Sequence, residues 1–397
     1  MKKIDVVREI RELKTHLSYS KNMGFFFGAG TSCALGLPNI SGLTEDVEKS
    51  LKGDAAKTFA AIKKDLEPTI ANRKVNIEDI LNQLRQIRDL TKESKSKAYE
   101  GVCGGDAKTA DTEICQEIYR IISEKERKAD LSLTNRFFAW YNLLNRDFSK
   151  EVFTTNYDLI IEKSLELSRI PYFDGFVGAY EPFFWQESID YPVTREDLTK
   201  NWVRLWKLHG SLSWFWRQDK ERRVNRIVRL GHIGDDKCVN NELVIYPSRE
   251  KYDSSRKQPF VAYFDRMRNY MSSGELLFVI SGYSFSDQHI NEIIFNCLRR
   301  NTRLFVLVFC YLDAEVEVVG KMSSAYLNLN VFGPTKAIIN GELCAWEFNK
   351  EILKPGEKAE IYWDEAKQTL ILGDFSGLVN FLVKSSGRQE LEGVPQK

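Results

Sequence analysis

The feature that most constrains this chain is a pair of apolar runs separated by a helical pattern. Residues 276–281 and 304–309 are apolar almost throughout, and residues 290–298 between them carry apolar side chains at helical spacing. Such runs are typical of strands buried on both faces of a parallel sheet, with the helix as the crossover. The same alternation is predicted earlier, with a strand at 152–153, a helix at 159–167 and a strand at 202–208. The sequence therefore predicts the α/β class, with a doubly wound, mostly parallel, Rossmann-like sheet.

The predicted sheet contains a helical insert and is followed by a small C-terminal addition. Apolar side chains recur at helical spacing over about 42–147, around a polar and aperiodic stretch at 92–112 that is predicted to be a mobile loop. We interpret 1–330 as one domain, with the insert as a lid over its cleft. Residues 331–397 are predicted to add a β-hairpin and a helix, either as a contact for oligomerisation or a partner, or as a plain addition to the core.

The composition excludes several classes of function. The 57 basic and 56 acidic residues among 397 nearly cancel, so the chain has no electrostatic footprint for nucleic acid or for an anionic membrane. Its longest apolar run, 304–312, is nine residues long, whereas a membrane span needs about 20. The seven cysteines include no C-x-x-C pair, and the N-terminus has no apolar signal segment. We therefore expect a cytoplasmic protein with no zinc site and no other metal.

A glycine-containing turn, Gly28-Ala29-Gly30-Thr31-Ser32, directly follows a short apolar strand predicted at 25–27. Because glycine has no Cβ, a phosphate oxygen can approach backbone N–H groups closely there, and the two hydroxyl side chains can add donors. The turn is not a P-loop, because no lysine follows the glycines, and Cys33 stands where a dinucleotide fingerprint has its third glycine. A phosphate-binding turn and a purely structural tight turn both fit this run.

Two further polar runs follow predicted strands. The first, Thr-Thr-Asn-Tyr-Asp at 154–158, puts Asn156 and Asp158 at the carboxyl edge of the sheet, where ligands bind in such folds. The alternative is a turn in which both side chains bond to their own backbone. The second, Lys-Leu-His-Gly-Ser at 207–211, puts His209 at the same edge. An imidazole there can take a proton from a hydroxyl group or a water near neutral pH, and the alternative is a structural histidine.

Together these runs resemble the motifs of the sirtuin-like (silent-information-regulator-like) family, over residues 24 to about 300. The matching runs are the glycine turn with Gly-Leu-Pro at 36–38, the Asn-x-Asp at 156–158, the histidine run and Gly-Tyr-Ser-Phe-Ser-Asp at 282–287. The resemblance implies that NAD binds as a substrate. Asn156 would orient ribose and water, His209 would act as the base, and Asp158 would bind the nicotinamide amide. The NAD-binding residues that it implies are Gly28, Ala29, Gly30, Thr31, Ser32, Thr155, Tyr157, Asp158, Gly282, Ser284 and Asp287.

The chain also departs from the family pattern. Sirtuin deacylases carry two C-x-x-C pairs for zinc and Asp-Phe-Arg after Gly-Leu-Pro, whereas this chain has no such pair and has Asn39-Ile40-Ser41. The remaining profile resembles bacterial antiphage proteins of this superfamily, which hydrolyse NAD to deplete an infected cell. The insert run Asn-Ile-Glu-Asp-Ile-Leu at 76–81 is typical of that branch.

The resemblance implies an NAD+ hydrolase (NADase) that releases nicotinamide and ADP-ribose in antiviral defence by abortive infection. It further implies a homo-oligomer and, as a possible partner, a HerA-type ATPase. Two alternatives belong to other classes of function. One is a regulatory subunit that senses NAD or ADP-ribose without cleaving it, and the other is a protein deacylase without zinc.

Overall fold

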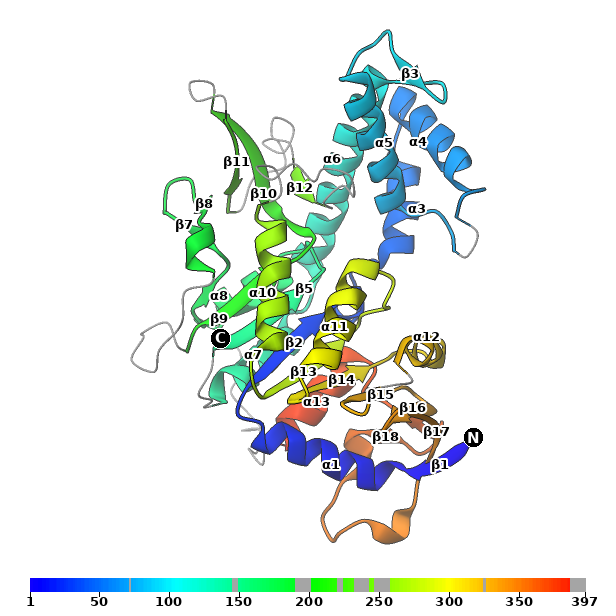
Figure 1. The fold of residues 1–397 in the computed structure, drawn as a ribbon, viewed down its shortest axis with the longest axis vertical. Helices are drawn as coiled ribbons and strands as arrows, with labels where there is room; N and C mark the ends of the chain where they lie inside the picture. The colour runs from blue at the N-terminus through cyan, green and yellow to red at the C-terminus, as the bar shows by residue number, and fades with distance from the viewer. Residues whose placement is uncertain are drawn as a thin grey trace.

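The computed structural model describes residues 1–70, 73–144, 149–189, 201–219, 224–231, 243–245, 258–323 and 326–385. Its framework is a ten-stranded sheet in the order β1-β17-β16-β15-β14-β13-β2-β5-β9-β6, with helices on both faces (Figure 1). Every neighbouring pair from β15 to β6 is parallel, as is β1 with β17, while β16 runs antiparallel to both of its neighbours. The strands are β1 (Lys2–Asp5), β2 (Met23–Phe27), β5 (Lys150–Thr154), β6 (Tyr172–Phe173), β9 (Val203–Lys207), β13 (Leu276–Ser281), β14 (Leu304–Phe309), β15 (Leu329–Phe332), β16 (Lys336–Ile339) and β17 (Glu342–Glu347).

Strand β2 lies at the centre of this sheet, and the chain winds away from it in two directions. Phe25 of β2 pairs with Val152 of β5 on one side and with Val279 of β13 on the other. The chain goes from β2 to β5 and β9 on the first side, and later builds β13, β14 and β15 on the second. The loops after β2 and β13 therefore diverge at a topological switch point, where ligands bind in such sheets. The predicted α/β class and mostly parallel, doubly wound sheet are confirmed.

The two faces of the sheet carry separate apolar layers, because side chains alternate along each strand. Phe25 and Phe27 face one layer, and Phe26 faces the other. The first layer contains α1 (Val6–Tyr19), α7 (Ser132–Leu143), α8 (Ile160–Leu167) and α13 (Phe375–Ser385). The second contains α10 (Phe260–Ser272), α11 (Gln288–Arg300) and α12 (Asp313–Ser323). Helices on both faces explain why the predicted strands are continuously apolar.

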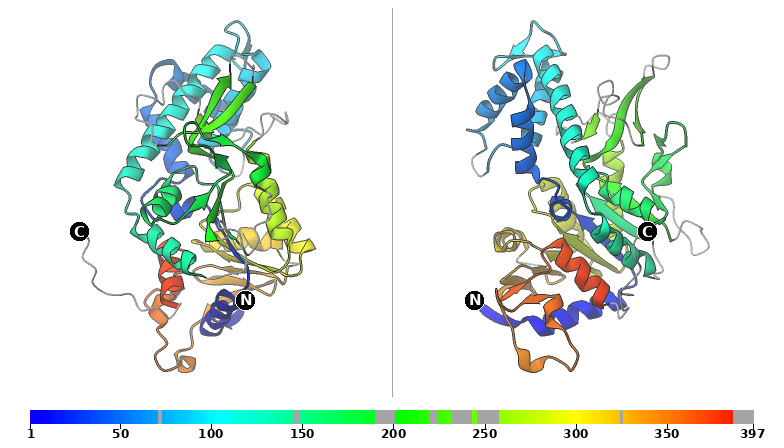
Figure 2. Two further views of the ribbon diagram at one scale, coloured as in Figure 1. Left: turned by 90° about the vertical axis from the view of Figure 1, so that its left-hand side faces the viewer. Right: turned by 180° about the vertical axis from the view of Figure 1, so that it is seen from behind.

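The helical insert stands at one end of the molecule, away from α1 and α13 (Figures 1 and 2). It comprises α3 (Ile40–Ser50), α4 (Gly53–Leu66), α5 (Ile77–Thr91), the short strands β3 (Ala98–Tyr99) and β4 (Val102–Cys103), and α6 (Gly104–Lys128), which share an apolar core. The predicted loop at 92–112 is wrong for residues 104–112, which form the start of α6. The first residue of that helix is glycine because a Cβ at position 104 would lie 2.0 Å from the Thr91 hydroxyl oxygen. Helix α7, predicted as part of the insert, instead packs on the large sheet through Phe137 and Phe138.

A second, five-stranded sheet lies beside the insert and was not predicted from the sequence. Its order is β12-β10-β11-β8-β7, from β7 (Phe176–Val177), β8 (Phe183–Phe184), β10 (Gly210–Asp219), β11 (Val224–Arg229) and β12 (Leu243–Ile245). Leu212 and Phe215 of β10 are buried in the apolar core of the insert. Strand β10 thereby joins the insert to the carboxyl edge of the large sheet.

The C-terminal part of the described chain is built into the large sheet and its first apolar layer. The division predicted at 330/331 falls within β15, and β16 and β17 extend the same sheet. The predicted hairpin is present as β18 (Trp363–Asp364) and β19 (Thr369–Leu370), which pair antiparallel. Asp374 precedes α13 and accepts a hydrogen bond from the Ser376 N–H at 2.7 Å. Because Trp363 and Phe375 are buried, this segment contributes to the core of the fold.

Candidate functional site

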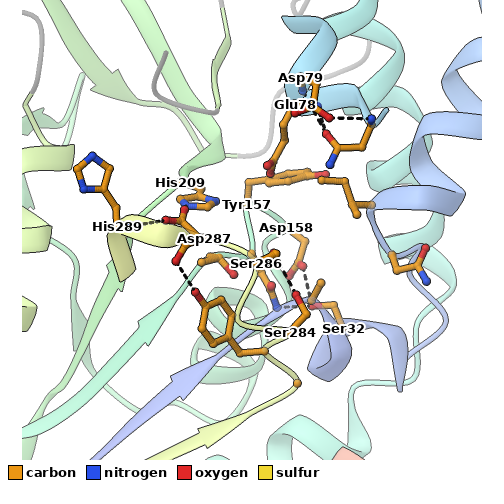
Figure 3. Close-up of a pocket in the computed structure, with 18 of the residues that line it drawn as sticks. Ser32, Glu78, Asp79, Tyr157, Asp158, His209, Ser284, Ser286, Asp287 and His289 are labelled. Carbon is orange, nitrogen blue, oxygen red and sulfur yellow. Dashed lines mark hydrogen bonds and ion pairs between the residues drawn. The ribbon is translucent and has the colours of Figure 1, made fainter. Parts of the chain in front are cut away.

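A cleft of about 2300 Å³ lies at the switch point, between the carboxyl edge of the large sheet and α5 of the insert. Figure 3 shows side chains from the glycine turn, from the loops after β5, β9 and β13 and from the insert arranged around it. Gly28 and Thr31 are not part of its lining. The other residues predicted from the sequence all line it, namely Ala29, Gly30, Ser32, Thr155, Asn156, Tyr157, Asp158, His209, Gly282, Ser284 and Asp287. The fold thus brings four separate runs of the chain together at one cavity.

The glycine turn leads into the short helix α2 (Ala29–Cys33) and packs tightly against the loop after β13. The N–H groups of Gly28 and Gly30 donate to the carbonyl oxygens of Ser281 and Gly282 at 3.0 and 2.9 Å. A Cβ at Gly28 would lie 2.4 Å from the Gly282 oxygen, and a Cβ at Gly30 would lie 2.7 Å from the Gly282 Cα. Glycine is therefore required at both positions by the approach of two loops. From the sequence, glycine is predicted for the close approach of a phosphate oxygen, whereas the N–H groups of Gly28 and Gly30 are bonded to carbonyl oxygens of the protein.

Asn156 ties the loop after β5 to the glycine turn. Its Nδ2 donates to the Gly28 carbonyl at 3.1 Å, to Thr31 Oγ1 at 3.2 Å and to Ser32 Oγ at 2.9 Å. Because a carbonyl oxygen can only accept, the contact with Gly28 determines which end of the amide is nitrogen. Asn156 is buried yet lines the cleft. Its Oδ1 is therefore the atom of the amide that can meet a ligand.

The carboxylate of Asp158 is held by the glycine turn and by the first residue of α8. Its Oδ2 accepts from Ser32 Oγ at 2.7 Å, and its Oδ1 accepts from the Ile160 N–H at 3.2 Å. The ammonium group of Lys207 donates to the Asp158 carbonyl oxygen and pairs with Glu162 Oε1 at 2.8 Å. Lys207 is only 2 % exposed, and a buried lysine is rare unless it is paired. The sequence run included Lys207, but its supporting role required the three-dimensional contacts.

His209 and Asp287 form a hydrogen-bonded pair at the sheet side of the cleft (Figure 3), with 3.0 Å between His209 Nε2 and Asp287 Oδ2. The other carboxylate oxygen of Asp287 accepts from the N–H groups of His289 and Ile290 at 2.8 and 3.2 Å and so caps α11. Burial alone would lower the pKa of His209, but the bond to Asp287 and the charges of Glu78 and Asp287 raise that pKa above its ordinary value. Burial raises the pKa of Asp287, yet the bond to His209 and its charge leave that pKa below its ordinary value. Asp287 was predicted as an NAD contact, and the structure places it as the partner of His209.

The loop that carries Asp287 has a well-defined backbone. Phe285 lies in the left-handed region with φ of 56°, and Asn291 Nδ2 donates to its carbonyl oxygen at 2.8 Å. The Tyr283 hydroxyl donates to Asn291 Oδ1 at 2.9 Å. The hydroxyl groups of Ser284 and Ser286 lie 3.1 Å apart at the cleft. These bonds hold the loop in the shape that presents Asp287 to His209.

Glu78 of the insert also lines the cleft, although no site role was predicted for it. It lies in the first turn of α5, behind the N-cap Asn76. Burial is the largest cause that raises the pKa of Glu78, Asp287 and Asp79 add to the rise, and His209 and Arg73 oppose it. Acidic residues are common in the first turn of any helix. The sequence pattern alone therefore does not distinguish Glu78 from an ordinary helix-capping acid.

No group of three or more His, Cys, Asp or Glu side chains that could hold a metal ion occurs within the described residues. The six cysteines that the structure describes are free thiols. Across the described ranges, no helix is both long enough and apolar enough to span a membrane.

The chain is similar to one family model and to several solved structures. No curated protein sequence matches this chain. The solved structures that match include a mutant Sir2 homologue in complex with 2′-O-acetyl ADP-ribose, with a TM-score of 0.36, 12% identity and coverage of 75% of this chain and 83% of that chain. They also include a Sir2 homologue in complex with NAD, with a TM-score of 0.35, 14% identity and coverage of 75% and 81%. At the level of family models, residues 150–321 match the SIR2-like domain, a range that includes Asn156, His209 and Asp287 but not the glycine turn.

Proposed function

We propose that this protein is an NAD+ hydrolase that cleaves the bond between nicotinamide and ribose. The observation that carries the proposal is the position of Asn156 and His209, which line one cleft beside the glycine turn. Both residues lie in the range that matches the SIR2-like domain, which supports the use of NAD. At about 2300 Å³ the cleft exceeds the roughly 300–1,000 Å³ of small-molecule sites, so its size is compatible with a dinucleotide.

The reaction makes few demands on acid–base chemistry at the leaving group. The ring nitrogen of nicotinamide is cationic in NAD+. When the C1′–N bond breaks, this nitrogen keeps the electron pair and nicotinamide leaves as a neutral molecule. Positive charge then develops at C1′ until the oxygen of water forms the new bond. The protein has to hold the substrate, stabilise that charge and place the water.

The proposed roles follow from the atoms that each residue has available. The oxygen of Asn156 holds the ribose and the attacking water, because its nitrogen is occupied by the glycine turn. His209 accepts the proton of that water, and Asp287 stabilises the imidazolium that forms. Asp158 binds the carboxamide of nicotinamide through lone pairs that its bonds to Ser32 and Ile160 leave unused.

Purified His209→Ala and Asn156→Ala variants test this proposal. We expect loss of turnover by about 10²–10⁴-fold for His209→Ala, the usual effect of removing a positioned base. NAD+ loss and nicotinamide release are measured for wild type and variants, with the protein alone and with a HerA-type ATPase. Wild-type hydrolysis that both variants retain would refute the assignment. Binding of NAD+ or ADP-ribose with no hydrolysis in any condition would favour a sensor, and turnover of an acyl-peptide would favour a deacylase.

We further propose, from the resemblance of the motifs, that the enzyme depletes NAD in bacterial antiphage defence as a cytoplasmic homo-oligomer with a HerA-type ATPase. A phage challenge of cells with the wild-type or the His209→Ala gene tests the cellular role. Cellular NAD should fall only with the wild type, and equal NAD levels in both would contradict it. Light scattering of the full chain, with and without the ATPase, tests the assembly. A single monomeric species in both samples would contradict that part of the proposal.

A further inference from the structure

The first turn of α5 contains two acidic side chains, of which Asp79 caps the helix and Glu78 lines the cleft. Asp79 completes the capping box with Asn76, accepting the Asn76 N–H at 3.0 Å, and it also accepts Arg73 Nη2 at 2.7 Å. Within the described ranges, the adjacent Glu78 carboxylate has no hydrogen bond or ion pair. It is half-buried and lines the cleft. The insert thus places the carboxylate of Glu78 at the cleft, and among the described residues this carboxylate makes no bond that stabilises the insert.

The surroundings of Glu78 are those of the proposed reaction centre. Figure 3 shows Glu78 extending from the insert toward Tyr157, with His209 and Asp287 coming from the loops of the sheet. Its charge acts on His209 strongly enough to raise the pKa of the imidazole. Four charged groups face Glu78, namely His209 and Asp287 from the sheet side, and Asp79 and Arg73 from the insert. Arg73 is paired with Asp79, so His209 is the cation of this set that lies across the cleft.

We propose that Glu78 is a third catalytic residue, whose carboxylate contacts the ribose hydroxyls beside nicotinamide and stabilises the positive charge that develops at C1′. This inference rests on the proposed function. A carboxylate bonded to a sugar hydroxyl strengthens that bond as the sugar becomes cationic, as in the hydrolysis of glycosides. The electron pair of the broken C1′–N bond stays on nicotinamide, the water oxygen bonds to C1′ and the water proton goes to His209. Glu78 gains and loses no proton in this step.

The role explains why the insert is part of the site. Asn156, Asp158 and the glycine turn are bonded to one another at the sheet edge. The carboxylate of Asp158 accepts from Ser32 and Ile160 and is the group that we assign to the amide of nicotinamide. Glu78 adds a second carboxylate to the cleft from the insert, where it has no donor within the described residues.

The test compares Glu78→Gln, which keeps the shape and removes the charge, with Glu292→Gln. Glu292 lines the same cleft from α11, is exposed and does not affect the pKa of His209, so it is a matched control. We expect kcat for NAD+ to fall about 10²-fold in Glu78→Gln, the scale of losing one stabilising group in the transition state. Glu78→Asp should fall between Glu78→Gln and the wild type, and Glu292→Gln should match the wild type.

Three readouts separate this role from a structural one. ADP-ribose affinity, measured by calorimetry, should stay within about threefold of wild type in Glu78→Gln, which shows an intact fold and binding site. The pKa of His209, followed by NMR, should fall in Glu78→Gln and stay unchanged in Glu292→Gln. Wild-type kcat in Glu78→Gln would overturn the inference while leaving NAD+ hydrolysis in place. A wild-type protein that hydrolyses no NAD+ in any condition would instead overturn the proposed function and this role with it.

Discussion

Replacing Gly30 with alanine tests the packing of the two loops at the centre of the site. The new Cβ would lie 2.7 Å from the Gly282 Cα, which is roughly 0.8 Å closer than the ~3.5 Å of ordinary carbon contacts. Opening the loops by that amount would stretch the 2.9 Å bond from Gly30 N–H to Gly282 oxygen beyond about 3.2 Å. Overpacking destabilises by about 1–3 kcal/mol, and the lost bond adds about 1 kcal/mol. Alanine offsets about 1 kcal/mol through its helix propensity, so the free energy of unfolding should fall by about 1–3 kcal/mol.

Gly42→Ala is the matched control for this substitution. Gly42 lies in α3, and a Cβ there would have its nearest neighbours at 3.5 Å, which is ordinary contact. We expect Gly42→Ala to be neutral or to stabilise by up to about 1 kcal/mol. Urea unfolding measures both variants, and NAD+ turnover should fall by about 10²-fold in Gly30→Ala alone, since the catalytic groups shift by nearly 1 Å. Equal unfolding midpoints and equal turnover in the two variants would refute the packing argument.

Two further substitutions test the supports of the site. Asp287→Asn keeps the helix cap but removes the charge beside His209, so the pKa of His209 should fall. The imidazole is then neutral at lower pH, and the acid limb of the plot of kcat against pH should move to lower pH. A profile between pH 5 and 9 that does not move would contradict this. Lys207→Met removes the buried cation under the Asp158 loop and leaves Glu162 uncompensated, so the free energy of unfolding should fall by about 3–5 kcal/mol. The double variant with Glu162→Gln should recover part of that loss in urea unfolding, and no recovery would show that the ion pair is not the cause.

The sequence predicts the parallel strands well because their burial on two faces requires continuous apolar runs. In the second sheet, β7 and β8 were missed because they contain two residues each, too few to show a period. The start of α6 was missed because Gly104-Gly105 is typical of a loop, whereas the close approach of Thr91 and of the Ser94 backbone explains glycine at position 104. Such contacts between distant segments leave no local pattern.

The same limit applies to the candidate site. The polar runs at strand ends could be predicted as neighbours, because parallel strands bring their carboxyl ends to one edge. The bond between His209 and Asp287 joins residues 78 positions apart, and its geometry depends on the cap of α11. An acidic residue directly before a helix predicts that Asp287 caps α11. Nothing in the local sequence predicts that the same carboxylate also bonds to His209.

The run that carries His209 also connects the site to the insert. Leu212, three residues further on, donates its N–H to the Tyr157 carbonyl at 2.8 Å and is buried in the apolar core of the insert. A movement of the insert therefore acts on the backbone beside both His209 and Asn156, while it also moves Glu78.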